Sequence, residues 1–228
     1  MTRARTVAAA EILLCSGFPT QILIGFALAL AGVRGLGTTV GAIATLLLLD
    51  TAVVVTLMVL FTRADGQSPR ALWLGSRPPV PEAVLGISLV PIVFALVAVL
   101  LTTLRLVAPA LRNVPDNPLE ALARQGPYES VLFGIVVIIS GGVREELQRA
   151  FMLRRFEDHL GGGTVGVVIL SVAFGLGHVQ QGWDAVVTTG VLGAFWAVLY
   201  QRRRSTVAPI VSHAGFNALE VARVALLG

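Results

Sequence analysis

Long uncharged runs of apolar residues constrain this chain more than any other feature. Seven runs approach the roughly 20 residues that a helix needs to cross the hydrocarbon core of a bilayer. The runs are continuous and lack the strict alternation typical of a membrane β-barrel. The sequence therefore predicts an all-α, polytopic membrane helix bundle of about seven (six to eight) transmembrane helices, in a single integral membrane domain over residues 1–228. The seven segments cover residues 12–33, 38–61, 82–101, 128 to beyond 151, 163–178, 183–200 and 206–227.

The overall composition excludes the other broad classes. Charged residues make up 13% of the chain and hydrophobic residues 55%, whereas a soluble domain carries about a quarter charged residues. Disorder requires low hydrophobicity and high charge. A secreted disulfide scaffold requires paired cysteines, and Cys15 is the single cysteine of the chain. A membrane protein is the class that remains.

Two connecting segments are longer than a simple turn. Residues 62–81 contain four prolines, which are not compatible with one continuous helix. Residues 102–127 contain an amphipathic stretch from Leu119 to Arg124, which we expect to lie in the membrane interface. A signal peptide is the alternative for the first apolar run, but the length of that run favours an uncleaved first helix.

The distribution of arginine predicts the orientation. Cytoplasmic loops of membrane proteins are rich in basic residues, and every one of the 17 basic residues here is Arg, a bias typical of a GC-rich, bacterial genome. This distribution predicts that the N-terminus lies in the cytoplasm and that the chain is a multi-pass protein of the cell inner (plasma) membrane. Because the arginines are scattered among apolar segments, no nucleic-acid partner is expected. The arginines then expected inside are Arg3, Arg5, Arg63, Arg70, Arg77, Arg154, Arg155, Arg202, Arg203 and Arg204, and those outside are Arg34, Arg105, Arg112 and Arg124.

Ionisable side chains within the fourth segment are the densest group of candidate functional residues. Arg144, Glu145, Glu146 and Arg149 lie there, and an ionisable group inside a bilayer costs about 3 kcal/mol or more unless it is paired or faces water. Arg149 stands four residues after Glu145 and three after Glu146, so either carboxylate is in reach. A self-neutralised structural cluster is the alternative interpretation.

Two further segments carry hydrogen-bonding side chains at comparable depth. His178 follows Phe174 by one turn at the end of the fifth segment, and His213 and Asn217 share one stripe of the seventh. At about 1.5 Å per residue, Glu145, His213 and His178 lie roughly 15, 12 and 18 Å from the inner ends of their segments. The sequence thus allows a shared site, with structural hydrogen bonds between helices as the alternative.

These motifs together resemble the CAAX-protease and bacteriocin-processing (CPBP, ABI) family. The family pattern is a glutamate pair followed by Arg, then Phe-x-x-x-His, then His-x-x-x-Asn or Asp. The chain has Glu145-Glu146 with Arg149, Phe174 to His178, and His213 to Asn217, in that order. The resemblance implies a catalytic core over residues 128–220. The family usually places the Arg one residue later, where this chain has Ala150.

The resemblance implies an intramembrane glutamic endopeptidase. Glu145 would be the general base that activates water, and His178 would hold and polarise that water. His213 and Asn217 would donate hydrogen bonds to the oxyanion, and Glu146 and Arg149 would support them. No cofactor is implied, and the substrate would be a peptide or membrane protein, cleaved near a C-terminus that is lipidated in part of the family. A cavity joining the four catalytic side chains is expected.

Three alternatives remain open on sequence. Glu145, His178 and His213 could supply a His₂Glu zinc set, although the His-Glu-x-x-His motif is absent. A transporter or proton relay could use the same groups together with Asp50, although no internal repeat supports it. A non-catalytic membrane scaffold that retains the motifs is the third alternative.

Overall fold

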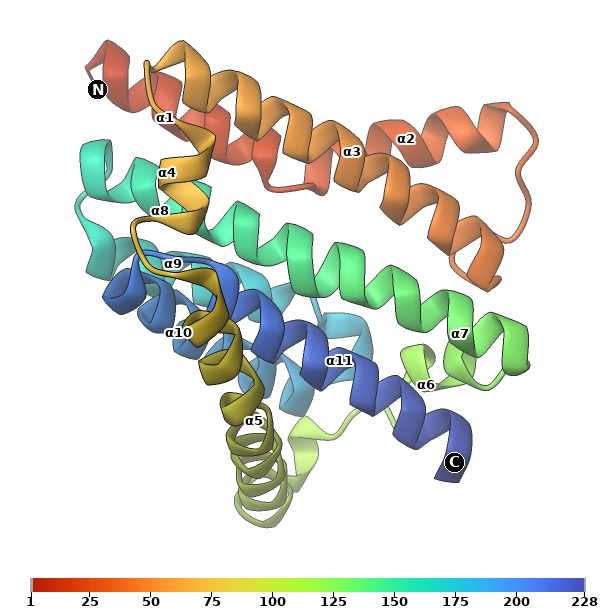
Figure 1. The fold of residues 1–228 in the computed structure, drawn as a ribbon. Helices are drawn as coiled ribbons and strands as arrows, with labels where there is room; N and C mark the ends of the chain where they lie inside the picture. Colours follow the sequence, from red (N-terminus) through yellow and green to blue (C-terminus); the bar gives the residue numbers. More distant parts are fainter. Residues whose placement is uncertain (1, 228) are drawn as a thin grey trace.

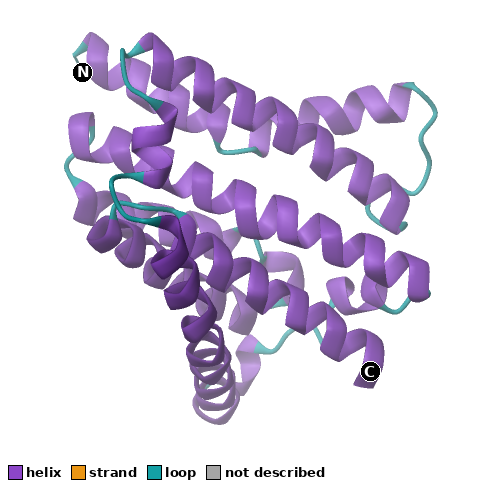
Figure 2. Ribbon diagram, in the orientation of Figure 1, coloured by secondary structure: helices purple, strands orange, loops and turns teal. Residues whose placement is uncertain are grey.

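The computed structural model describes residues 2–227, and over that range the chain consists of helices and connecting loops (Figure 2). The predicted all-helical architecture is confirmed. The helices, in chain order, are α1 (Arg3–Cys15), α2 (Phe18–Leu30), α3 (Val40–Ala64), α4 (Pro69–Leu74), α5 (Pro79–Val107), the 3₁₀ turn η1 (Pro109–Leu111), α6 (Pro118–Ala123), α7 (Pro127–Val136), the π-helix η2 (Val137–Arg144), α8 (Glu145–His159), α9 (Gly163–Leu176), the 3₁₀ turn η3 (Val179–Gln181), α10 (Trp183–Arg203) and α11 (Val207–Leu227).

A continuous rod made of α7, η2 and α8 runs through the middle of the bundle (Figure 1). Helices α1 and α3 pack on one side of this rod, and α9 and α11 pack on the other. Helix α11 runs alongside the rod, where it contacts η2 more extensively than α7, and it packs still more extensively against α5. Helix α10 packs against α9, and α5 crosses α11 near the start of both helices. The rod is therefore the element that both halves of the chain contact.

Each of the seven predicted segments corresponds to a helix or a helix series. Helices α3, α5, α10 and α11 are long and apolar enough to cross a membrane, and the bent pair α1 and α2 adds a fifth candidate. Helix α9 is apolar but has only 14 residues. The charged rod supplies the remaining predicted segment. A bundle of about seven helices is consistent with this set, and the chain is a membrane protein.

The first predicted span is not one straight helix, which corrects the sequence prediction. Helices α1 and α2 meet at an angle of 43°. Gly17 has a φ of +82° at the junction, a left-handed conformation that glycine adopts without the cost it imposes on other residues. Because this conformation cannot continue a right-handed helix, the chain turns there.

Both long connections contain short capped helices. The Ser68 hydroxyl accepts a hydrogen bond from the Ala71 backbone N–H at the start of α4. The Asn117 side chain accepts one from the Leu119 N–H at the start of α6. Proline follows each cap, at the first helical position, where its missing N–H costs nothing. The amphipathic stretch expected around residues 119–124 is thus helical over most of its length.

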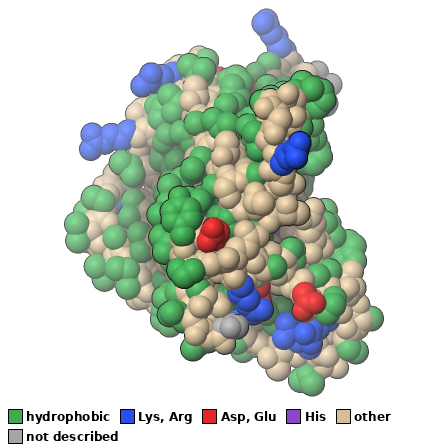
Figure 3. All heavy atoms as spheres, turned by 90° about the vertical axis from the view of Figure 1, so that its right-hand side faces the viewer, with side chains coloured by type: hydrophobic (Ala, Val, Ile, Leu, Met, Phe, Trp, Pro, Cys, Tyr) green, Lys and Arg blue, Asp and Glu red, His purple; other side chains and the backbone are tan. Residues whose placement is uncertain are grey.

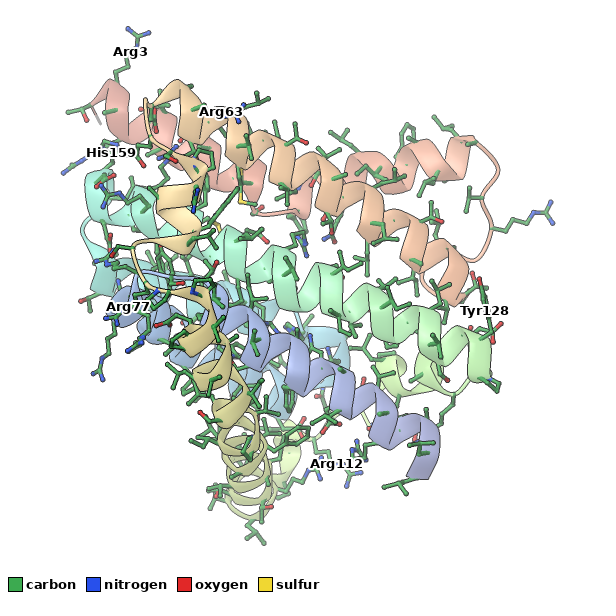
Figure 4. The ribbon with its side chains drawn as sticks, in the orientation of Figure 1. Arg3, Arg63, Arg77, Arg112, Tyr128 and His159 are labelled. Carbon is green, nitrogen blue, oxygen red and sulfur yellow. The ribbon has the colours of Figure 1, made fainter. Side chains whose placement is uncertain are left out.

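The surface agrees with a bilayer environment. The face turned to the viewer in Figure 3 combines apolar side chains with backbone and uncharged side chains, and its charged groups are scattered. Arg3, Arg63 and Arg77, which the arginine distribution assigns to the cytoplasm, lie toward one end of the bundle with His159 (Figure 4). Arg112, assigned to the opposite side, lies away from them.

Candidate active site

A buried cluster joins the rod to α11 through the second glutamate of the pair. Glu146 Oε1 lies 2.8 Å from His213 Nδ1. Arg149 donates two hydrogen bonds to the same carboxylate, at 3.1 Å to Oε2 and 3.3 Å to Oε1. All three side chains are at least 95% inaccessible. The first and third motifs therefore meet directly in the folded chain.

Arg149 reaches Glu146 despite its shifted position in the sequence. The two residues are three apart on α8, a spacing that places side chains on one helix face. Ala150, at the position where the family usually has Arg, is fully buried in an apolar cluster with Leu153 and Tyr200. The one-residue shift thus leaves a Glu–Arg pair intact.

The ring of Phe174 connects the second motif to this cluster. Its centroid lies 4.9 Å from that of His178 and 6.2 Å from that of His213, both with edge geometry. The Arg149 guanidinium carbon lies 4.7 Å from the same centroid, a cation–π distance. Phe174 belongs to the second motif, which by itself indicates no role for this side chain. In the structure it is the side chain that touches all three partners.

His178 lies just beyond the end of α9, in the turn before η3. Its Nδ1 is 2.8 Å from the carbonyl oxygen of Phe174. A carbonyl only accepts, so this contact assigns the proton of the neutral ring to Nδ1 and leaves the Nε2 lone pair available. The side chain is partly accessible, so that lone pair can meet water.

Trp196 and Ser212 hold His213, and sequence analysis missed both. The Trp196 ring stacks on His213 with centroids 3.8 Å apart and an angle of 14° between the planes. Its indole N–H donates to the Ser212 hydroxyl at 3.0 Å. A tryptophan in an apolar span gives no signal of this role, because the contact joins α10 to α11 and depends on how they pack.

A π-helical segment immediately before the glutamates sets their direction. Residues 137–144 form η2, whose i→i+5 hydrogen bonds differ from the α-helical pattern that the sequence predicts, and π segments often mark functional sites. Asn217 donates to the carbonyl of Val137 at 3.3 Å. Gly141 and Gly142 let α11 approach closely, and this glycine pair is the sequence signal that could have identified the segment.

Gly142 yields a direct test of that close approach. A Cβ added there would lie 2.5 Å from the Ala214 Cβ, so Gly142→Ala must push α11 away from η2. Overpacking of this kind costs about 1–3 kcal/mol. We expect a lower melting temperature and a loss of activity as His213 moves away. Gly41→Ala, a helical position with nothing within 4 Å of the added Cβ, is the matched control and should leave both unchanged.

Glu145 lies outside the buried cluster. Its carboxylate contacts Arg144 at 3.6 Å, and 23% of its side chain is accessible. Among residues 2–227, no hydrogen bond or ion pair joins Glu145 directly to His178, His213 or Asn217. Two hollows lie on α5 and between α5 and α10, and neither is lined by these four residues. The four predicted catalytic side chains are thus not in mutual contact within the described residues, and His178 and His213 share Phe174 as a neighbour.

The predicted zinc alternative finds no geometric support within the described chain. Over residues 2–227, no three His, Cys, Asp or Glu side chains are arranged to hold a metal ion. Glu145, His178 and His213 belong to no such group. We therefore derive no chemical step through a metal.

Comparison with known proteins agrees with the resemblance inferred from the motifs. Residues 127–219 match the family described as type II CAAX prenyl endopeptidase Rce1-like. No curated protein and no solved structure matches the chain. All three motifs fall within the matched residues, which form the rod, α9, α10 and most of α11. The chain therefore carries, over residues 127–219, a domain of the Rce1-like type II CAAX prenyl endopeptidase family, a family of peptide hydrolases.

Proposed function

We propose that this membrane protein is an intramembrane endopeptidase in which Glu145 activates the water that attacks a peptide carbonyl. The contrast between two adjacent glutamates carries the proposal. Glu146 is 99% inaccessible, and both of its oxygens are engaged by Arg149 and His213. Within residues 2–227, Glu145 has one ion pair, and 23% of its side chain is accessible. A general base must reach water, and of the two only Glu145 is free to do so.

His213 and Asn217 are the proposed oxyanion donors. With Nδ1–H donated to Glu146, His213 donates through Nε2 when the ring is doubly protonated. Stacking on Trp196 fixes the ring plane of His213. Asn217 lies one turn further along α11 and contributes a second donor from its amide. Preorganised donors in a dry site stabilise a developing oxyanion strongly.

His178 completes the proposed set as the group that orients the water. Its Nε2 lone pair accepts a hydrogen bond from the water, because Nδ1 already donates to the Phe174 carbonyl. Glu145 takes a proton as the water oxygen bonds to the substrate carbonyl carbon. Glu145 then returns the proton to the leaving amine as the C–N bond breaks. After one peptide bond has been hydrolysed, the protein has returned to its initial protonation state.

The substrate is proposed to be a peptide or membrane protein cleaved near a lipidated C-terminus. The prenyl endopeptidase description of the matched family supports this choice. The cluster of predicted cytoplasmic arginines at one end supports a bacterial inner-membrane protein with its N-terminus in the cytoplasm (Figure 4). A substrate helix would have to unwind locally to present its carbonyl.

Cleavage by the purified chain tests the proposal. Two synthetic peptides, identical except for a farnesyl group on the cysteine fourth from the C-terminus, are incubated with the protein in proteoliposomes. Mass spectrometry identifies the products. Release of the last three residues from the lipidated peptide is the expected result. Equal cleavage by wild type and by Glu145→Gln would contradict the mechanism.

Removal of metal ions is expected to leave activity unchanged. A zinc protease loses its nucleophile when the ion is chelated, whereas a glutamate-activated water needs no ion. Rates after treatment with 1,10-phenanthroline should remain within about twofold of the untreated rate. A loss that added zinc reverses would contradict the metal-free mechanism and favour the zinc alternative.

A further inference from the structure

Arg144 connects the proposed base to a second buried network in the part of the chain that the family match does not cover. Its Nη2 lies 3.6 Å from Glu145 Oε1, and its Nη1 lies 3.3 Å from Asp50 Oδ2. Arg144 is the last residue of η2, and Asp50 lies in the middle of α3. A single guanidinium therefore bridges the two carboxylates.

Asp50 is held rigidly on the far side of this bridge. Its side chain is fully inaccessible. Besides Arg144, it accepts hydrogen bonds from the Thr20 hydroxyl and from the Gln21 amide, the latter at 3.1 Å. Both donors come from the first turn of α2. A carboxylate with three donors around it fixes the guanidinium that it faces.

The bend in the first span makes room for that guanidinium. A Cβ added at Gly17 would lie 2.8 Å from Arg144 Nη1 and 3.5 Å from Asp50 Oδ2. The break between α1 and α2 thus brings a bare backbone against the ion pair and aims Thr20 and Gln21 at Asp50. The 43° bend and the network occupy one place in the fold.

We propose that Asp50 and Arg144 are positioning residues that hold the Glu145 carboxylate in its reactive orientation. The inference rests on the proposed role of Glu145. One cation stands between two carboxylates, and the buried Asp50 with its two extra donors is the closer partner. Asp50 therefore limits how tightly Arg144 can bind Glu145. The carboxylate of Glu145 is oriented by Arg144 yet stays free to take a proton.

Asp50→Asn and Arg144→Met test this role by steady-state kinetics. Misplacement of a reacting group by about 1 Å costs roughly 100-fold in rate, so we expect kcat to fall by about 10- to 100-fold with KM nearly unchanged. Arg144→Lys keeps the charge and should recover part of the loss. A purely structural role would lower the amount of folded protein but would leave kcat per folded molecule unchanged.

Glu11 and Arg155 supply the matched control pair. They form another buried ion pair between the N-terminal helices and α8, and Glu145 is not among the partners of either residue. Glu11→Gln and Arg155→Met should lower the melting temperature without lowering kcat of the folded protein. Loss of kcat in both pairs alike would overturn the inference.

A glycine comparison keeps the test usable if the charge variants do not fold. Gly17→Ala and Gly32→Ala place alanine at the same φ of +82° and so carry similar backbone strain. The added methyl at Gly32 meets nothing within 4 Å, whereas at Gly17 it meets Arg144. We expect kcat to fall in Gly17→Ala alone, and equal kcat values in the two variants would overturn the positioning role.

Parallel assays of Glu145→Gln separate this inference from the proposed function. Full activity in Glu145→Gln would remove the proposed base, and the positioning role would fall with it. Loss of activity in Glu145→Gln, with wild-type kcat in Asp50→Asn, Arg144→Met and Gly17→Ala, would leave the base in place and overturn the positioning role alone.

Discussion

Replacement of Glu145 by Gln is expected to lower the rate of peptide cleavage by about 10²- to 10⁴-fold, the contribution of a positioned general base. Gln keeps the size of the side chain but cannot accept a proton from water. Because Glu145 is partly accessible and, among residues 2–227, has only Arg144 as an ion partner, we expect its contribution to stability to be small. We expect the melting temperature to stay within about 2 °C of wild type, which corresponds to at most about 1 kcal/mol for a chain of this length.

Glu129→Gln provides a matched control for that measurement. Glu129 lies in the first turn of α7, at the far end of the same rod, and should retain the wild-type rate. Single-turnover kinetics then assign the loss in Glu145→Gln to the chemical step. Wild-type cleavage by Glu145→Gln would show that another group activates the water.

Replacement of the neighbouring Glu146 by Gln is expected to abolish activity and also to destabilise the fold. The substitution removes the charge that faces both Arg149 and His213 in a fully buried setting. An uncompensated buried charge costs about 3–5 kcal/mol, which corresponds to a fall in melting temperature of roughly 6–20 °C. His213 also loses the carboxylate that lies 2.8 Å from its Nδ1.

The double variant Glu146→Gln with Arg149→Met separates the two effects. It removes both charges, and replacing a whole buried pair is often close to neutral for stability. We therefore expect the melting temperature to recover most of its loss while the activity stays low, because His213 remains without its carboxylate. Thermal unfolding in detergent and the cleavage assay measure these quantities on the same samples. Recovery of both together would reduce Glu146 to a purely structural residue.

The sequence predicted which helices carry the polar side chains of the candidate site, but not which contacts those side chains make. It placed the three motifs on three segments at comparable depth, and the fold brings Glu146, Arg149, Phe174, His178 and His213 into one chain of contacts. It left open which glutamate pairs with Arg149, because spacings of three and four residues both place side chains on one face. The π segment rotates the glutamates in a way that an α-helical pattern does not predict.

The contact partners that lie outside the motifs could not be predicted from the sequence for a different reason. Trp196 and Asp50 lie in apolar spans, and nothing local indicates which neighbour each will meet. Their contacts with His213 and Arg144 join residues 17 and 94 positions apart in the chain. Such contacts follow from helix packing, and the glycines that permit that packing act through the absence of a side chain.

By itself, the sequence determined that this chain is a helical membrane bundle with its polar chemistry in the second half. Bilayer thickness sets the length of a spanning segment, and its backbone hydrogen bonds must be satisfied within the helix. Both requirements act on consecutive residues, so they can be recognised in the sequence. Only the tertiary structure decided that Glu146 anchors His213, that Glu145 stays accessible, and that Arg144 ties Glu145 to Asp50. These choices depend on the bend at Gly17, the π-helix before the glutamates and the close approach of α11, each set by long-range packing.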